Sequence, residues 1–368
     1  MCSEWPLIPL RDFVDLLAGF AFKSTGYSDG QDDVRLLRGD NIAPGRVRWD
    51  GVKRWSRENA VGLERYALEP GDVVLAMDRP WIPAGLKVAQ VQAADTPSYL
   101  VQRVARIRPA SREDCSFLFA LLSTPEFESY IQNVTTGTAV PHISAKQILD
   151  FEFRLPPAYV RAKVGEIVAA LNERITLLRE TNTTLEAIAQ ALFKSWFVDF
   201  DPVHARARGE QPAGLAPEVA ALFPDSFEES DLGKIPKGWT IGRVEDLMEL
   251  AYGKALKATA RIDGPIPVYG SGGITGYHNE SLVNGPSIIV GRKGTVGSLY
   301  WEDLPFFPID TVFYVKTQKP QTYCFYLLQR LGLKDMNTDA AVPGLNRNNV
   351  YRLQVLRKVR ISGEILLG

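Results

Sequence analysis

The sequence lacks most of the features that mark secreted, membrane-spanning or metal-binding proteins. Its 368 residues include only three cysteines and three histidines, scattered along the chain without metal-ligand spacing. This scarcity argues against a disulfide framework or a zinc site and indicates a reducing cytosol. The chain also has no run of about 18 apolar residues and no signal-peptide pattern at its start. We therefore expect a cytoplasmic protein with no metal site and no membrane segment.

Recognisable catalytic motifs are missing as well. The sequence contains no GxxxxGK[ST] phosphate loop, no (N/D)PP(Y/F) tetrapeptide of adenine methyltransferases, and no lysine with a carboxylate two residues before it. Residues 270–276 are rich in glycine but miss the GxGxxG spacing, so we interpret them as a turn. A net charge of −1 neither indicates nor excludes a nucleic-acid partner. These absences favour a non-catalytic binding protein without a cofactor of its own.

The most distinctive feature present in the sequence is one long heptad pattern. Apolar residues recur every seven positions from about residue 158 to 196, with a second set three or four residues further on, as in a coiled-coil seam. A helix of that length spans roughly 58 Å and cannot bury its own stripe. A long helix packed only on its own domain is the alternative. The predicted seam comprises Val164, Leu171, Ile175, Leu178, Asn182, Leu185, Ile188, Leu192 and Trp196.

Composition and turn signals divide the rest of the chain. Residues 1–157 mix short apolar strands with Pro-Gly turns, and 239–357 do the same after a Gly-Trp start. Between them, 158–200 is the predicted spacer helix, and 201–238, rich in proline, glycine and acid, is predicted to be an extended linker. A short tail, 358–368, follows. The fold class we expect is mixed α/β, with two similar domains separated by the helix.

The two globular segments resemble each other at both ends. Their middles diverge, but three stretches align in the same order. A repeat marked in this way predicts two copies of one recognition module. The aligned stretches are 5–12 with 239–246, 19–23 with 253–257, and 136–141 with 338–343.

Cationic and small polar residues in predicted loops are candidate DNA contacts, because phosphates are bound by Lys, Arg and hydroxyl groups and base edges by polar side chains. The pair Arg292–Lys293 lies between glycines that would let the backbone approach a phosphate. The alternatives are a solvated turn for the cations and helix capping for the threonines. The candidates are Lys23, Arg38, Asn41, Arg79, Thr136, Thr138, Lys257, Arg292, Lys293, Thr295 and Asn337.

Taken together, these blocks resemble the specificity subunits of type I restriction-modification systems. The resemblance rests on the paired Trp…Asp…Gly-x-Ala-x-Lys starts, Gly-Thr-Ala-Val-Pro-x-Ile at 137–143, the helical block 171–182, and Gln190 to Val203; it covers residues 1 to about 356. It implies two target-recognition domains, each reading half of a split double-stranded DNA sequence in phage defence. It also implies that methyltransferase subunits carry S-adenosylmethionine, and that restriction subunits bring the chemistry that uses ATP and magnesium.

One departure from the family's pattern concerns the last residues. The family normally places a second long helix after the second recognition domain, antiparallel to the first. Residues 358–368 allow about three helical turns at most. We therefore expect a homodimer through residues 160–196, or another subunit, to supply the partner helix. The alternative function is a coiled-coil scaffold that binds proteins without DNA specificity, and an enzyme with unrecognised chemistry ranks third.

Overall fold

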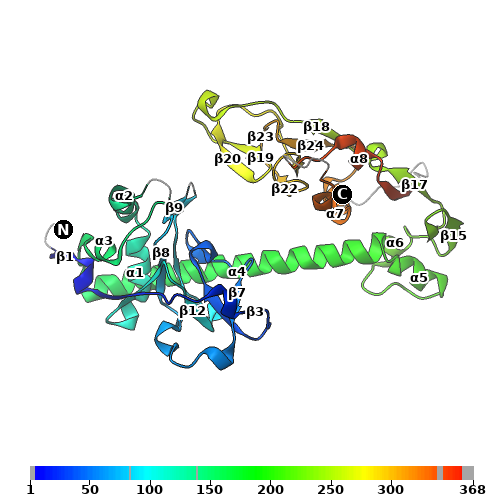
Figure 1. Cartoon of the computed structure of the whole chain (residues 1–368). Helices are drawn as coiled ribbons and strands as arrows, with labels where there is room; N and C mark the ends of the chain where they lie inside the picture. Colours follow the sequence, from blue (N-terminus) through cyan, green and yellow to red (C-terminus); the bar gives the residue numbers. More distant parts are fainter. Residues whose placement is uncertain (1–4, 83, 138–139, 338–342, 359–368) are drawn as a thin grey trace. The chain divides into compact units, whose positions relative to one another are not determined.

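The computed structural model describes residues 5–82, 84–137, 140–337 and 343–358. The chain divides into two compact units, Met1–Thr181 and Asn182–Gly368, which we treat separately (Figure 1). Each unit contains a mixed helix-and-sheet module, and a 40-residue helix, α4 (Ala158–Phe197), connects them along the chain. The predicted fold class and long helix are confirmed. Within the described ranges, no helix is long and apolar enough to cross a membrane.

The first unit is built on an antiparallel sheet with the strand order β11-β8-β13-β2. All four residues of β8 are buried, as its continuous apolar sequence predicts for a central strand. A second four-stranded sheet has the order β12-β4-β7-β3. The strands of the two sheets are β2 (Val14–Ala18), β8 (Val73–Ala76), β11 (Val88–Gln90), β13 (Val104–Pro109), β3 (Tyr27–Ser28), β4 (Val34–Leu37), β7 (Lys53–Trp55) and β12 (Ser98–Leu100).

Short hairpins and helices complete the first unit. Its core lies between the main sheet and the helices, where Leu118, Phe127 and Ile148 are fully buried. Ser144 and Gln147 form a capping box at the start of the third helix. The remaining elements are β1 (Leu7–Pro9) paired with β14 (Glu152–Arg154), β5 (Ile42–Ala43) with β6 (Arg46–Val47), β9 (Trp81–Ile82) with β10 (Gly85–Leu86), and helices α1 (Cys115–Leu122), α2 (Pro125–Val134) and α3 (Ala145–Leu149).

The second unit repeats the main sheet of the first. Its strand order is β18-β24-β21-β22, which corresponds strand for strand to β2-β13-β8-β11, and it packs against α7 and α8. The pair β17–β25 likewise corresponds to β1–β14. The elements are β17 (Trp239–Arg243), β18 (Glu249–Tyr252), β21 (Ser287–Gly291), β22 (Leu299–Glu302), β24 (Val312–Lys316), β25 (Gln354–Lys358), α7 (Gln321–Arg330), α8 (Arg347–Tyr351), and a small sheet of β19 (Ile266–Gly270), β20 (Gly273–His278) and β23 (Phe307–Pro308).

The segment between α4 and β17 is not the extended linker that its composition predicts. It forms α5 (Asp201–Ala207), α6 (Pro217–Ala220) and the hairpin of β15 (Phe227–Ser230) with β16 (Gly233–Pro236). Phe200, Phe223 and Trp239 are buried together there, and Trp196 of α4 packs against Phe223 with ring centroids 5.9 Å apart. The linker prediction was wrong because these widely spaced aromatic residues bury enough apolar surface to fold a proline-rich segment.

Helix α4 is packed at its two ends and exposed between them. Near its start, Arg161 makes two hydrogen bonds to the buried carboxylate of Asp114, and Val164 packs on the core of the first unit. Near its end, Phe193 is buried against Tyr323 and Tyr326 of α7. The exposed apolar stripe between these ends comprises Ile167, Leu171, Ile175, Leu178, Leu185, Ile188 and Leu192, which are 42–57% exposed.

Candidate nucleic-acid interface

The aligned starts of the two repeats occupy the same place in both units. A Cβ atom on Gly19 would lie 2.2 Å from the Val101 carbonyl oxygen, and one on Gly253 would lie 2.1 Å from that of Ile309. Such contacts are too close for any side chain, so the main chain passes over its neighbour at the same point in both units. Lys23 and Lys257 follow at equivalent positions. Each is exposed and immediately precedes one turn of 3-10 helix, η3 (Ser24–Gly26) and η10 (Ala258–Ala260).

The prolines that end the paired Ala-Val-Pro stretches accept equivalent backbone hydrogen bonds in the two units. The Arg79 N–H donates to the Pro141 carbonyl, and the Gly294 N–H donates to that of Pro343. Similarly, the Ile143 N–H donates to the backbone carbonyl of Met77, and the Leu345 N–H donates to the backbone carbonyl of Arg292. The loop after β8 and the loop after β21 are therefore equivalent. Two candidates chosen independently from the sequence, Arg79 and Lys293, lie within one residue of each other in the repeat.

In the first unit, basic side chains gather around the loop after β8. We call this group the β8-end cluster; its cations are Arg38, Arg48, Arg79, Lys87 and Arg103, and its carboxylates are Asp40 and Asp78. The carboxylate of Asp40 pairs with Arg38 at 3.4 Å, and that of Asp78 pairs with Arg103 at 3.8 Å. Arg79 is exposed and has a left-handed backbone, with φ of 45°. The cluster carries more positive than negative charge, as an anion-binding surface requires.

Sequence reasoning missed Lys87, which is the most buried cation of this cluster. It lies between β10 and β11 and is 7% exposed. Burial lowers the pKa of its ammonium group, since the low-dielectric surroundings disfavour the charged form. In the sequence, Lys87 stands alone between Leu86 and Val88 and carries no motif. Only the fold brings it beside Arg48 and Arg79.

Asn41 is not placed to read a base. Its side chain is 5% exposed, its amide oxygen accepts a hydrogen bond from the Arg38 backbone N–H, and its amide nitrogen donates to the Arg48 carbonyl. These bonds hold the turn η4 (Gly39–Asn41) in shape, which makes Asn41 a structural residue of the loop. The Arg38 guanidinium remains partly exposed, with 39% of its side chain accessible.

In the second unit, two guanidinium groups contact the ring of Tyr252. The Cζ atoms of Arg292 and Arg347 lie 4.9 and 4.8 Å from its centroid, and Arg292 also donates to the Asp310 carbonyl. Cation–π contacts of this kind stabilise the loop. Charge reversal of Arg292 would therefore disturb the packing of this loop as well as any contact with DNA. Lys293, next along the chain, is exposed and suits that test better.

The remaining candidate contacts surround these loops. Thr136 is exposed and pairs through its backbone with His142. Asn337 accepts a hydrogen bond from the Gly344 N–H through its side chain, and Thr295 is exposed beside Gly294. Thr138 lies outside the described residues. The expectation that these side chains contact DNA stays a prediction.

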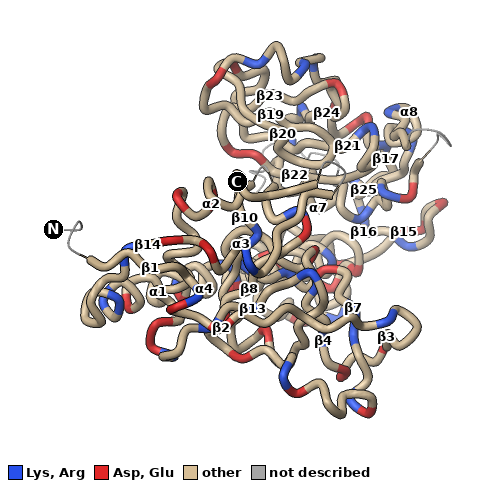
Figure 2. Tube along the Cα trace, turned by 60° about the vertical axis from the view of Figure 1, so that its left-hand side comes forward, with Lys and Arg blue, Asp and Glu red and all other residues tan. Residues whose placement is uncertain are grey.

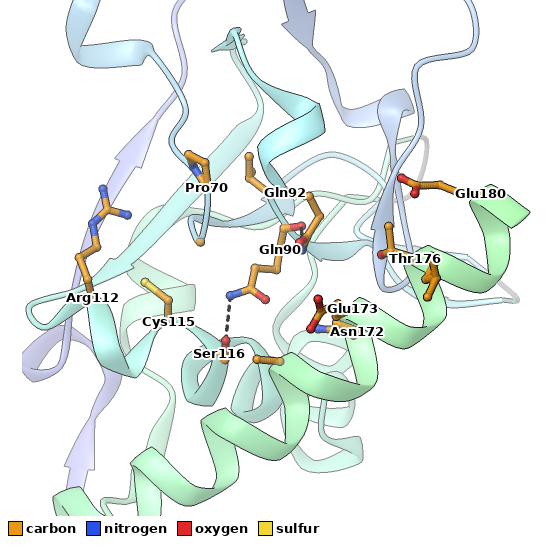
Figure 3. Close-up of a pocket in the computed structure, with 14 residues that line it drawn as sticks. Pro70, Gln90, Gln92, Arg112, Cys115, Ser116, Asn172, Glu173, Thr176 and Glu180 are labelled. Atoms are coloured by element: carbon orange, nitrogen blue, oxygen red, sulfur yellow. Dashed lines mark hydrogen bonds between the residues drawn. The ribbon is translucent and has the colours of Figure 1, made fainter.

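An open groove of about 690 Å³ lies elsewhere in the first unit, between β11 and α4 (Figure 3). Gln90 reaches into it and donates to the Ser116 hydroxyl, while Asn172 and Thr176 line it from the helix (Figure 3). Its one cation, Arg112, is engaged by the carboxylates of Glu69 and Asp72. The groove therefore offers no free positive charge and is not part of the basic surface.

Charges of both signs alternate along the trace of each unit, so the basic groups are local rather than one continuous stripe (Figure 2). Among the residues that the structure covers, no three His, Cys, Asp or Glu side chains converge as metal ligands would. The predicted seam is also shorter than its heptads indicate. Val164 and Trp196 pack within the first and second units respectively, whereas Asn182 is exposed in the stretch between.

Comparisons with known proteins place these features in a family. Residues 3–187 and 236–356 match the type I restriction modification DNA specificity domain. The MjaVIII specificity subunit of Methanocaldococcus jannaschii is 27% identical over 50% of this chain and 43% of its own length. The HindI specificity subunit of Haemophilus influenzae is 31% identical over 52% of this chain and 50% of its own length.

The chain thus spans half or less of the length of these curated relatives. A crystal structure of the type I restriction-modification S subunit from M. genitalium has the same fold, with a TM-score of 0.50 and 14% identity over 96% of this chain and 85% of the other. Because the family's domain matches this chain twice, on both sides of the segment after α4, the chain belongs to the type I restriction modification DNA specificity domain family.

Proposed function

We propose that this chain is the non-catalytic specificity subunit of a type I restriction-modification complex, in which each unit reads one half of a two-part DNA target. The observation that carries the proposal is the equivalence of the loops after β8 and β21. Each presents an exposed cation, Arg79 or Lys293, at positions one residue apart in the repeated backbone. Two equivalent surfaces on one chain favour two separate contacts with one duplex.

Partner subunits carry out the chemistry in this proposal. Methyltransferase subunits with S-adenosylmethionine dock on α4, and restriction subunits add the steps that use ATP and magnesium. The support is the exposed apolar stripe of α4, whose side chains are about half accessible although they recur at seam spacing. A second copy of this chain is the other partner that could cover this stripe. If the chain alone sediments as a stable monomer, the homodimer is contradicted. The methyltransferase subunits then remain as the partner that covers the stripe.

The proposal is tested by co-expressing the chain with its cognate methyltransferase subunit and mapping adenine methylation by long-read sequencing. We expect one new motif made of two short halves separated by a fixed gap. Charge reversal of exposed Lys293 should reduce methylation at that motif without loss of co-purification. If the two proteins co-purify and no motif is methylated, the DNA-specificity role is wrong.

That last outcome would favour the second candidate function, a coiled-coil scaffold that binds proteins only. The exposed stripe on α4 is consistent with a scaffold. A scaffold has no need, however, of basic loops placed at equivalent points of a repeat. Measuring retention of double-stranded DNA by the purified complex at low and high salt separates the two, because phosphate contacts weaken steeply as salt rises.

A further inference from the structure

We propose that Lys87 binds a backbone phosphate of the DNA, in a site completed by Arg48, Arg79 and the turn at Gly39. The inference rests on the proposed function and assigns one of its contacts to a residue that no sequence motif marks. It concerns only the first unit, where the whole site lies.

The first argument is that Lys87 is buried without a partner. The residue is 7% exposed, yet only longer-range charge interactions and burial act on its ammonium group. No hydrogen bond or ion pair joins that group to any residue within the described ranges. An ammonium group that is largely shielded from water and has no acceptor is costly, and the cost is removed when an anion binds.

The second argument is that the nearby carboxylates are already engaged. Asp40 pairs with Arg38, and Asp78 pairs with Arg103. Among the charges that act on Lys87, Asp40 has the largest influence and favours the charged form, whereas Arg48 and Arg79 disfavour it. The site therefore holds a local excess of positive charge around a buried ammonium group, and a phosphate oxygen supplies the missing negative charge.

The third argument comes from the backbone of Arg79. Its φ of 45° lies in the left-handed region, and the equivalent residue of the second unit is Gly294, with φ of 82°. Glycine adopts this conformation at little cost, whereas an arginine pays for its Cβ. Strained residues persist at sites where the side chain has a function. The guanidinium group of Arg79 is such a side chain, since it is exposed beside Lys87.

The fourth argument is access. A Cβ atom built on Gly39 would meet nothing nearer than the Ala76 Cβ at 3.8 Å and the Lys87 Nζ at 3.9 Å. The ammonium group therefore lies directly beside a turn residue that has no side chain to cover it. Among the described residues, the Lys87 Nζ atom is not one of the unpaired polar atoms that are fully enclosed by protein. A phosphate can approach it over Gly39.

The experiment compares the wild-type chain and Lys87→Met, each in complex with its methyltransferase subunits. The probes are a duplex that carries the mapped motif and a scrambled duplex of equal length. We expect Lys87→Met to weaken binding of both about tenfold, and to reduce the slope of log affinity against log salt by about 1, as loss of one phosphate contact does. The melting temperature should not fall, because the substitution removes an uncompensated buried charge. Lys146→Met, on α3, is the control for loss of an exposed lysine.

Two further measurements identify the phosphate. Neutral methylphosphonates placed one at a time along the motif duplex should include a position that weakens binding by the wild type but not by Lys87→Met. Gly39→Ala should weaken binding while the fold stays intact, because its methyl group fills the approach to Nζ without a clash.

Unchanged affinity and salt slope for Lys87→Met would overturn the assignment, as would a loss of melting temperature that fully accounts for weaker binding. An effect of inorganic phosphate on the melting temperature, without any methylphosphonate position sensitive to Lys87, would show an adventitious anion site and also overturn it. If the wild-type complex binds neither duplex, the proposed function itself fails, and the assignment fails with it.

Discussion

At equivalent points of their main sheets, the first unit buries a charged side chain and the second buries a neutral one. Asp72 is 0% exposed, accepts two hydrogen bonds from Arg108 at 2.7 and 2.8 Å, and also pairs with Arg112. Its counterpart by strand register is Ser287, 2% exposed, whose hydroxyl donates to the Val315 carbonyl. The two units therefore share a backbone fold although the buried polar side chains at equivalent positions differ in charge.

The same contrast extends to the loops. The turn after β8 has an arginine in the left-handed region where the turn after β21 has glycine. What the two units keep in common is the hydrogen bonding of the main chain and the two glycines that lie against carbonyl groups. We infer that backbone geometry places the loops, and that the side chains at those places can differ between the units.

The largest expected effect comes from the buried charge. Asp72→Ala should destabilise the first unit by about 3–5 kcal/mol, since it leaves Arg108 without its buried partner. Ser287→Ala should cost the second unit only about 1 kcal/mol, the net value of one neutral hydrogen bond. Hydrogen exchange, read peptide by peptide, reports each unit separately and avoids assuming a single unfolding transition. Equal losses of protection in the two units would contradict this contrast.

The paired glycines should behave alike. Gly19→Ala and Gly253→Ala each force a backbone shift, because the new Cβ would lie about 2 Å from a carbonyl oxygen. We expect a loss of about 2–3 kcal/mol in the unit that carries the substitution and little change in the other. Gly45→Ala is no control because of its positive φ, whereas Gly39→Ala, with only ordinary van der Waals contacts and no positive φ, is a suitable one. A large difference between the two units would show that the repeat is not equivalent there.

Arg79 and Gly294, the equivalent residues with a left-handed backbone, allow the stability of each unit to be compared with its DNA affinity. Arg79→Gly should stabilise the first unit by at most about 1 kcal/mol, by relieving its backbone, and at the same time weaken DNA binding. Gly294→Arg should destabilise the second unit by a similar amount. Thermal melting and fluorescence anisotropy on the same samples measure both effects. If Arg79→Gly leaves the affinity unchanged, the strain at Arg79 has no role in binding.

The smallest effect at neutral pH concerns buried tyrosines of the second unit. Burial raises the pKa of Tyr323 to about 12, and burial beside Glu302 raises that of Tyr269. A tyrosine in the unfolded chain ionises near pH 10. The buried neutral tyrosines therefore contribute fully to the free energy of unfolding below about pH 10, and this contribution is lost as the pH rises from there toward 12. Tyrosinate absorbance at alkaline pH, followed with hydrogen exchange, should show the second unit opening first. The Tyr323→Phe variant should reduce this sensitivity.

Sequence patterns predicted the features that are local or repeated. The heptads predicted α4, and the aligned stretches predicted the two modules, because each pattern is made of residues that lie close together in the chain. The linker was mispredicted because proline and acid dominate its composition while a few distant aromatic residues decide its packing.

The candidate site was predictable only in part. The loops with Arg79 and Lys293 follow from turn signals, but Asn41 proved buried and Lys87 was overlooked. Both errors have one cause. The burial of a polar side chain and the charges beside it depend on strands that lie far apart in the sequence. Composition and residue spacing therefore cannot predict them.

The exposed stripe of α4 has a consequence for how the chain is handled inside a cell. Seven apolar side chains, each about half accessible, form a surface of the kind that chaperones and proteases recognise on incomplete proteins. A copy to which no other protein binds keeps that surface in contact with water. We expect its cellular lifetime to follow the supply of the protein that covers the helix, so that assembly itself sets how much of this subunit is present.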